Sequence, residues 1–138
     1  MISRAIRWQT RSDYSHAAWV CPDFSVIEAW WPHGVRHVAD PFLLHTEDTE
    51  IDLWAVSGLT AQQEREVERF LRLQLGKRYD MRGVFQFLSR RPCPQNERWF
   101  CSELVAAALD LAGAPLLHAA PHLLAPGHLP WSTRLHLV

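Results

Sequence analysis

The sequence predicts a single α+β domain in which an antiparallel sheet packs on helices. Its 138 residues are enough to enclose one hydrophobic core. Near the N-terminus, two short runs rich in aromatic and β-branched residues flank a turn-like segment, a pattern typical of a β-hairpin. Two later segments combine the apolar spacing of helices with helix start and stop signals. We therefore expect residues 1–138 to fold as one unit.

The predicted hairpin comprises residues 14–20 and 25–31, joined by a Cys-Pro-Asp segment. If the turn is centred on Pro22, His16 lies opposite Glu28. Directly opposed residues point to the same face of a sheet, with Cβ atoms roughly 4.5–5.5 Å apart. A carboxylate there can accept a hydrogen bond from one imidazole nitrogen, fix the tautomer and leave the other nitrogen for a thiol.

A charged helix is predicted to follow a strand at residues 51–57. Thr60 and Gln63 have the spacing of a capping box, and Gly76 is expected to close the helix. Its buried face is predicted to comprise Val67, Phe70 and Leu71. The remaining predicted elements are strands at residues 2–9 and 133–138, a short helix at residues 81–89 and a covering loop at residues 115–130.

The segment WFCSELVAAALDLAG predicts a second helix, which begins at Cys101. Gly113 is placed to be the residue that ends it, and Pro115 prevents continuation. Its expected buried face comprises Leu104, Val105, Ala108, Leu111 and Ala112. A thiol in the first turn of a helix faces unpaired N–H groups and the positive end of the macrodipole, which favour the thiolate. Cys101 is therefore the candidate nucleophile, and a structural buried cysteine is the alternative.

Cys101, His16 and Glu28 would together supply a nucleophile, its base and a group that orients the base. The other two thiols lack a helix N-terminus, because Cys21 lies in a turn and Cys93 lies between two prolines. Three cysteines without framework spacing indicate reduced thiols rather than a disulfide scaffold.

Four motifs, SHAAWV, VIEAWWPHGV, GKRYD and FCSELV, occur in this order over about residues 15–107. They resemble the circularly permuted branch of the papain-like NlpC cell-wall hydrolases, which includes YiiX-like proteins and, more distantly, lecithin:retinol acyltransferase. In unpermuted members the cysteine helix precedes the histidine strand. The resemblance implies a permuted papain-like fold with Cys101 as nucleophile, His16 as base and Glu28 as the third catalytic residue. It also implies that Tyr79 lines the cleft.

The chain contains seven tryptophans, many for its length. Trp30 lies beside Glu28 in the sequence, and Trp99 precedes Cys101 by two residues. We expect both, with Tyr79, to bind substrate, because aromatic rings stack on sugars and contact lipid. Packing in the core is the alternative role for each of these side chains.

The expected activity is hydrolysis of an amide bond by a cysteine peptidase, and the resemblance places that bond in a peptidoglycan stem peptide. One alternative is an acyltransferase or thioesterase that forms the same acyl-cysteine from lipid esters. Another is a non-catalytic phage or cell-wall structural or binding module. No cofactor or metal is expected, because neither of the two closely spaced histidine pairs has an acidic or cysteine partner at ligand spacing.

A formal net charge of −1 argues against nucleic acid as a partner. The N-terminal segment lacks an apolar core, and no run approaches the length of a membrane span, so no signal peptide and no integral membrane segment are expected. A cell-wall hydrolase of this kind would be made in the cytoplasm. It would then be virion-associated or be delivered to the periplasm by another machine, such as phage tail proteins.

Overall fold

The computed structural model describes residues 12–45, 48–82 and 98–138. In these ranges the chain combines helices with one three-stranded and two two-stranded sheets, an architecture compatible with the predicted α+β class. The predicted strand at residues 2–9, most of the predicted helix at residues 81–89, and Cys93 lie outside the described residues.

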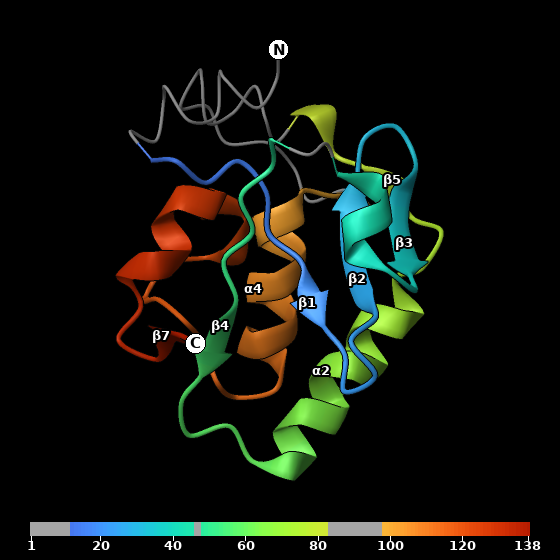
Figure 1. Ribbon diagram of the computed structural model, residues 1–138. Coiled ribbons are helices and arrows are strands. Elements are labelled where there is room, and N and C mark those ends of the chain that lie inside the picture. Colours follow the sequence, from blue (N-terminus) through green and yellow to red (C-terminus); the bar gives the residue numbers. More distant parts are fainter. Residues whose placement is uncertain (1–11, 46–47, 83–97) are drawn as a thin grey trace.

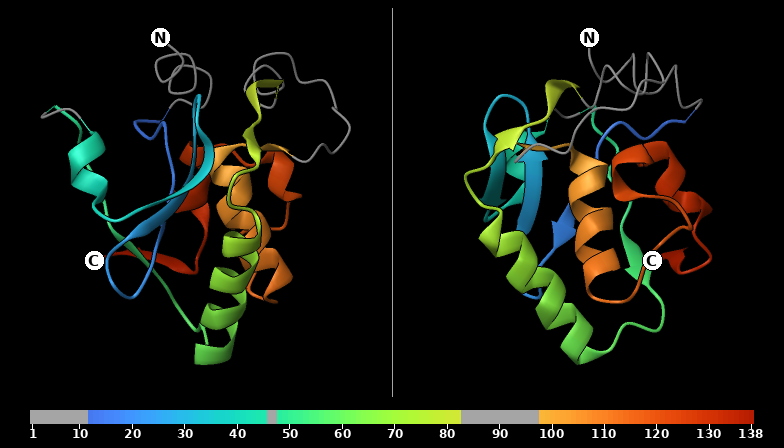
Figure 2. Two further views of the ribbon diagram at one scale, coloured as in Figure 1. Left: turned by 90° about the vertical axis from the view of Figure 1, so that its right-hand side faces the viewer. Right: turned by 180° about the vertical axis from the view of Figure 1, so that it is seen from behind.

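The largest sheet contains β1 (Trp19–Val20), β2 (Val26–Trp30) and β3 (Gly34–Val38), in that order and with antiparallel pairing throughout. Viewed from the side, this sheet forms one layer, and the helices α2 (Ala61–Leu73) and α4 (Cys101–Leu111) form the other (Figure 2). The core lies between the two layers and contains side chains from both.

Two further sheets contain two strands each. Their strands are β4 (Trp54–Val56) with β7 (Leu135–Leu137), and β5 (Arg78–Tyr79) with β6 (Arg98–Trp99). The β4–β7 pair is antiparallel, so the strands predicted at residues 51–57 and 133–138 are confirmed in shortened form. The β5–β6 pair is parallel, which departs from the predicted antiparallel arrangement.

The β1–β2 hairpin differs in register from the prediction. Trp19 pairs with Ile27, which centres the turn on Asp23 instead of Pro22. The cause is the loop of residues 22–24, in which Phe24 adopts the left-handed conformation with a φ of 65°. A three-residue loop that ends in this conformation is a common way to close a hairpin, but it usually contains glycine or asparagine at that position.

The prediction that His16 lies directly opposite Glu28 is therefore wrong. When the observed register is extended beyond β1, Trp30 occupies the position opposite His16. Because side chains alternate along a strand, a shift of two residues leaves His16 on the face that carries both Glu28 and Trp30. His16 consequently meets Glu28 diagonally across the hairpin.

The capping box predicted at the start of α2 is present. The Thr60 hydroxyl accepts a hydrogen bond from the Gln63 backbone N–H at 3.2 Å, and the Gln63 side chain accepts one from the Thr60 N–H at 3.0 Å. Val67 and Leu71 are buried, and Phe70 packs against the core, as predicted. A 3₁₀ helix, η1 (Pro41–Leu44), precedes β4 in the chain.

Helix α4 begins at Cys101, as predicted, and ends in a Schellman motif. The N–H of Gly113, which has a φ of 76°, bonds the Asp110 carbonyl, and the Ala114 N–H bonds the Leu109 carbonyl. Leu111 is 70% exposed, so the prediction that it is buried is wrong. The buried face is rotated toward Leu109, which turns Leu111 to solvent.

The segment after α4 packs against that helix rather than merely covering it. The buried Ser102 hydroxyl donates a hydrogen bond of 2.5 Å to the Leu124 carbonyl. Leu116 and Leu129 also belong to the core. The segment contains the 3₁₀ helices η2 (Pro121–Leu123) and η3 (Pro126–Trp131). It therefore anchors the first turn of α4, where Cys101 lies.

Candidate active site

Cys101 is the first residue of α4 and is 1% exposed. The helix begins near the end of the molecule at which β2 ends (Figure 1). Residues in the first turn of a helix have backbone N–H groups without partners inside the helix. The thiol therefore lies beside donors that can stabilise a negative charge on sulfur or on a bound oxygen.

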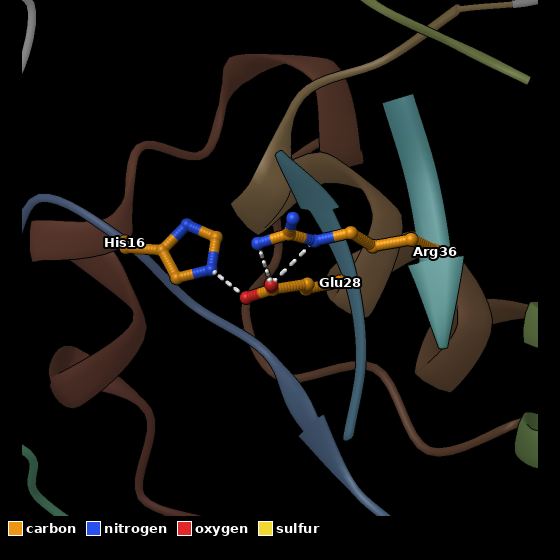
Figure 3. Close-up of polar contacts among 3 residues, drawn as sticks. All are labelled: His16, Glu28 and Arg36. Atoms are coloured by element: carbon orange, nitrogen blue, oxygen red, sulfur yellow. Dashed lines mark hydrogen bonds and ion pairs between the residues drawn. The ribbon is translucent and has the colours of Figure 1, made fainter. Parts of the chain in front are cut away.

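His16 lies in the extended segment before β1, and its ring connects Glu28 with Cys101. Nε2 of the ring and Oε2 of Glu28 are 2.7 Å apart, and the other ring nitrogen points away from this contact (Figure 3). Burial lowers the pKa of His16, but hydrogen bonds to Cys101 and Glu28 outweigh it and raise the pKa to about 9. The ring is therefore an imidazolium at neutral pH. Glu28 and Cys101 thus both act on the His16 ring, and their joint role in catalysis stays a prediction.

Glu28 is the buried anchor of this arrangement, with 2% of the residue exposed. One carboxylate oxygen accepts the contact from His16, and the other accepts two N–H groups of Arg36, from Nε at 3.0 Å and Nη2 at 2.8 Å (Figure 3). Burial raises the pKa of Glu28, but hydrogen bonds and positive charges from His16 and Arg36 outweigh burial and hold the pKa below its ordinary value.

Arg36 is the site residue that sequence reasoning misses, because the predicted elements include no strand at residues 34–38. In the β2–β3 ladder it lies directly opposite Glu28. A second hairpin centred on Pro32 would have placed the two residues in this register. The available signal is the pair of β-branched residues Val35 and Val38 after Gly34, which favours a strand.

Trp30 packs against both neighbours of the carboxylate. Its ring meets that of His16 edge to face at a centroid distance of 4.9 Å, and the Arg36 guanidinium lies 5.0 Å from its centroid. His45 contacts the same indole at 5.4 Å. Trp30 thus restricts the orientation of the His16 ring, a structural role next to its predicted role in substrate binding.

Tyr79 lies near Cys101, the candidate nucleophile. Its ring contacts Phe100 at a centroid distance of 5.9 Å and the exposed Trp31 at 6.3 Å. Burial and the negative charges of Cys101 and Asp80 raise the pKa of Tyr79, so its hydroxyl is neutral and available as a donor. The role of Tyr79 in binding substrate stays a prediction.

Trp99 lies against helix α2. Its indole N–H donates to the Gln74 side chain at 3.0 Å, and its ring meets Phe70 at a centroid distance of 5.7 Å. These contacts do not connect Trp99 with His16 or with the thiol of Cys101. The chain leaves β6 after Trp99 and enters α4 at Cys101, so closeness in sequence does not by itself bring the indole to the thiol, and its role in binding substrate stays a prediction.

A second carboxyl lies next to Cys101 in the first turn of α4. The Glu103 side chain accepts a hydrogen bond from the Phe100 N–H at 3.3 Å. Burial raises the pKa of Glu103, the Phe100 hydrogen bond lowers it and the charge of Asp80 raises it, and the net result is a pKa of about 7. Near neutral pH, part of the population therefore carries a neutral carboxylic acid here.

We expect Glu103→Gln to stabilise the protein above neutral pH. The pKa in the folded state lies above the ordinary value of 4.5, so the contribution of this group to stability is full below pH 4.5 and is lost as the pH rises through 7. The variant should gain on the order of 1–3 kcal/mol of unfolding free energy at pH 8 and little at pH 4, measured by urea denaturation. Glu64→Gln, at an exposed carboxylate in the first turn of α2, is the matched control. A gain in unfolding free energy that does not depend on pH would contradict the raised pKa of Glu103.

Neither a protein-family model nor a curated protein matches the chain. In the part of the chain that the structure describes, no helix is long and apolar enough to cross a membrane. Residues 12–45, 48–82 and 98–138 also contain no group of three or more metal-ligating side chains placed to hold an ion.

Proposed function

We propose that the protein is a cysteine-dependent amide hydrolase with Cys101 as its nucleophile. The observation that carries the proposal is the position of His16, which interacts with Cys101 and lies 2.7 Å from the buried carboxylate of Glu28. This is the order of nucleophile, base and orienting group that activates cysteine in hydrolases. The pKa of His16, raised to about 9, supports a resting state in which the ring is an imidazolium.

In the proposed reaction the Cys101 thiolate attacks the carbonyl carbon of the amide. Backbone N–H groups at the start of α4 stabilise the oxyanion. The His16 imidazolium then gives its proton to the leaving nitrogen, so that the C–N bond breaks and a thioester remains. Neutral His16 next takes a proton from water, and the resulting hydroxide attacks the thioester. The acid leaves, and the thiolate and imidazolium are restored.

We propose a peptidoglycan stem peptide as substrate and a permuted papain-like arrangement as the fold. Both proposals rest on the resemblance of the four motifs to permuted NlpC cell-wall hydrolases. Along the chain, His16, Glu28, Tyr79 and Cys101 follow the order histidine, carboxylate, tyrosine, cysteine of those motifs. His16 interacts with Glu28 and Cys101, and Tyr79 with Cys101.

Incubation with purified sacculi tests the proposal. The wild-type protein is expected to release new amino termini, quantified by amine-reactive labelling and located in muropeptides by mass spectrometry. A thioester on Cys101 after exposure to phospholipid vesicles, with sacculi left intact, would indicate the lipid acyltransferase instead. A folded protein inert toward both substrates would indicate a binding module and contradict the proposal.

A further inference from the structure

The reaction proposed above does not use Arg36, yet this residue contacts the carboxylate that binds His16. It donates two hydrogen bonds to a single oxygen of Glu28, at 2.8 and 3.0 Å. The other oxygen of the same carboxylate faces His16. Two cations from the two flanking segments thus share one carboxylate that is only 2% exposed.

The shared carboxylate couples the charge on Arg36 to the proton on His16. Glu28 alone would present a full negative charge to the imidazolium and hold its proton tightly. Arg36 offsets part of that charge, so the neutral form of His16 does not leave behind an unpaired buried carboxylate. A histidine that must both give and take a proton works best when its pKa is near the operating pH.

We propose that Arg36 is a positioning residue of the active site, which offsets the charge of Glu28 and fixes its carboxylate so that His16 can release its proton. The proposal rests on the proposed function, because it assigns Arg36 a part in the proton transfers of that reaction. The described groups that face His16 or its partner are Cys101 from α4, Glu28 from β2 and Arg36 from β3. Tyr79 from β5 faces Cys101.

Arg36→Met tests the proposal, because methionine keeps an unbranched side chain beside Trp30 and removes the charge. The midpoint of the His16 ring titration, read by ¹³C-histidine NMR and assigned with His16→Gln, should rise by about 1 pH unit. Arg36→Lys keeps a charge and should leave the midpoint near that of wild type. The matched control Arg65→Met, at an exposed position on α2, should not move it.

The double variant Glu28→Gln with Arg36→Met separates charge from packing. Its His16 midpoint should fall between the low value of Glu28→Gln and the high value of Arg36→Met. If Arg36 only stabilises the pairing of β2 with β3, its variants will lower the unfolding temperature while the midpoint of the His16 titration does not change, and that result overturns the proposal.

The titration does not require turnover. A raised midpoint with inert sacculi therefore refutes the proposed substrate alone, and an unmoved midpoint with cleaved sacculi refutes this inference alone.

Discussion

Replacing Cys101 by alanine is expected to abolish the release of amino groups from sacculi, a loss of roughly 10,000-fold or more. Without the sulfur no thioester forms, and His16 and the helix N-terminus alone cannot supply a nucleophile. The fold should persist. The side chain is 1% exposed and small, so its truncation costs on the order of 1 kcal/mol of a total stability of about 5–15 kcal/mol.

Cys21→Ala is the matched control for this loss. Cys21 is also buried, at 3% exposed, but it lies at the turn between β1 and β2 and should be dispensable for activity. Glu28→Gln should fall between the two variants, because an amide can still hold the His16 ring but no longer balances its charge. A Cys101→Ala variant that retains a tenth of the activity would mean that another group is the nucleophile.

The helices could be predicted because their signals are local. Thr60 and Gln63 cap α2 within one turn, and the conformation of Gly113 ends α4 at the predicted place. Each signal acts over three or four residues and does not depend on what packs nearby. Leu111 shows the limit, because the rotation of a buried face is decided by the neighbouring layer rather than by the helix itself.

The contact between His16 and Glu28 was predictable from the sequence, but its geometry was not. The face shared by His16 and Glu28 follows from strand periodicity, which any shift of two residues preserves. The register of the hairpin does not follow from this periodicity. It depends on Phe24 adopting a left-handed conformation, which a phenylalanine in the sequence does not predict. Arg36 could be found only after β3 was paired with β2, since its role comes from a partner eight residues away.

Gly34→Ala is expected to destabilise the protein more than alanine at Gly58, Gly76 or Gly113. A Cβ built on Gly34 would lie 2.2 Å from the carbonyl oxygen of Lys77 and 3.3 Å from the Cα of Arg78. Both contacts are with backbone, so no side-chain rotation can relieve them. Hydrogen bonds of 2.8 Å from the Val35 N–H to Lys77 O, and of 2.9 Å from the Gly76 N–H to Val35 O, hold the segments at this distance.

The expected loss is about 3 kcal/mol or more of unfolding free energy, made up of roughly 1–2 kcal/mol for a left-handed alanine and the remainder for the clash. Gly58→Ala isolates the first contribution, because Gly58 has a φ of 71° and a methyl group added there would meet nothing within 4 Å. Urea denaturation of both variants gives the difference between their unfolding free energies.

Activity should fall as well, because Arg36 follows Gly34 by two residues on β3, and Tyr79, on β5, follows Lys77 by two. Equal losses for the two glycine variants would show that β3 does not approach Lys77 this closely, and the placement of Tyr79 beside Cys101 would lose its support.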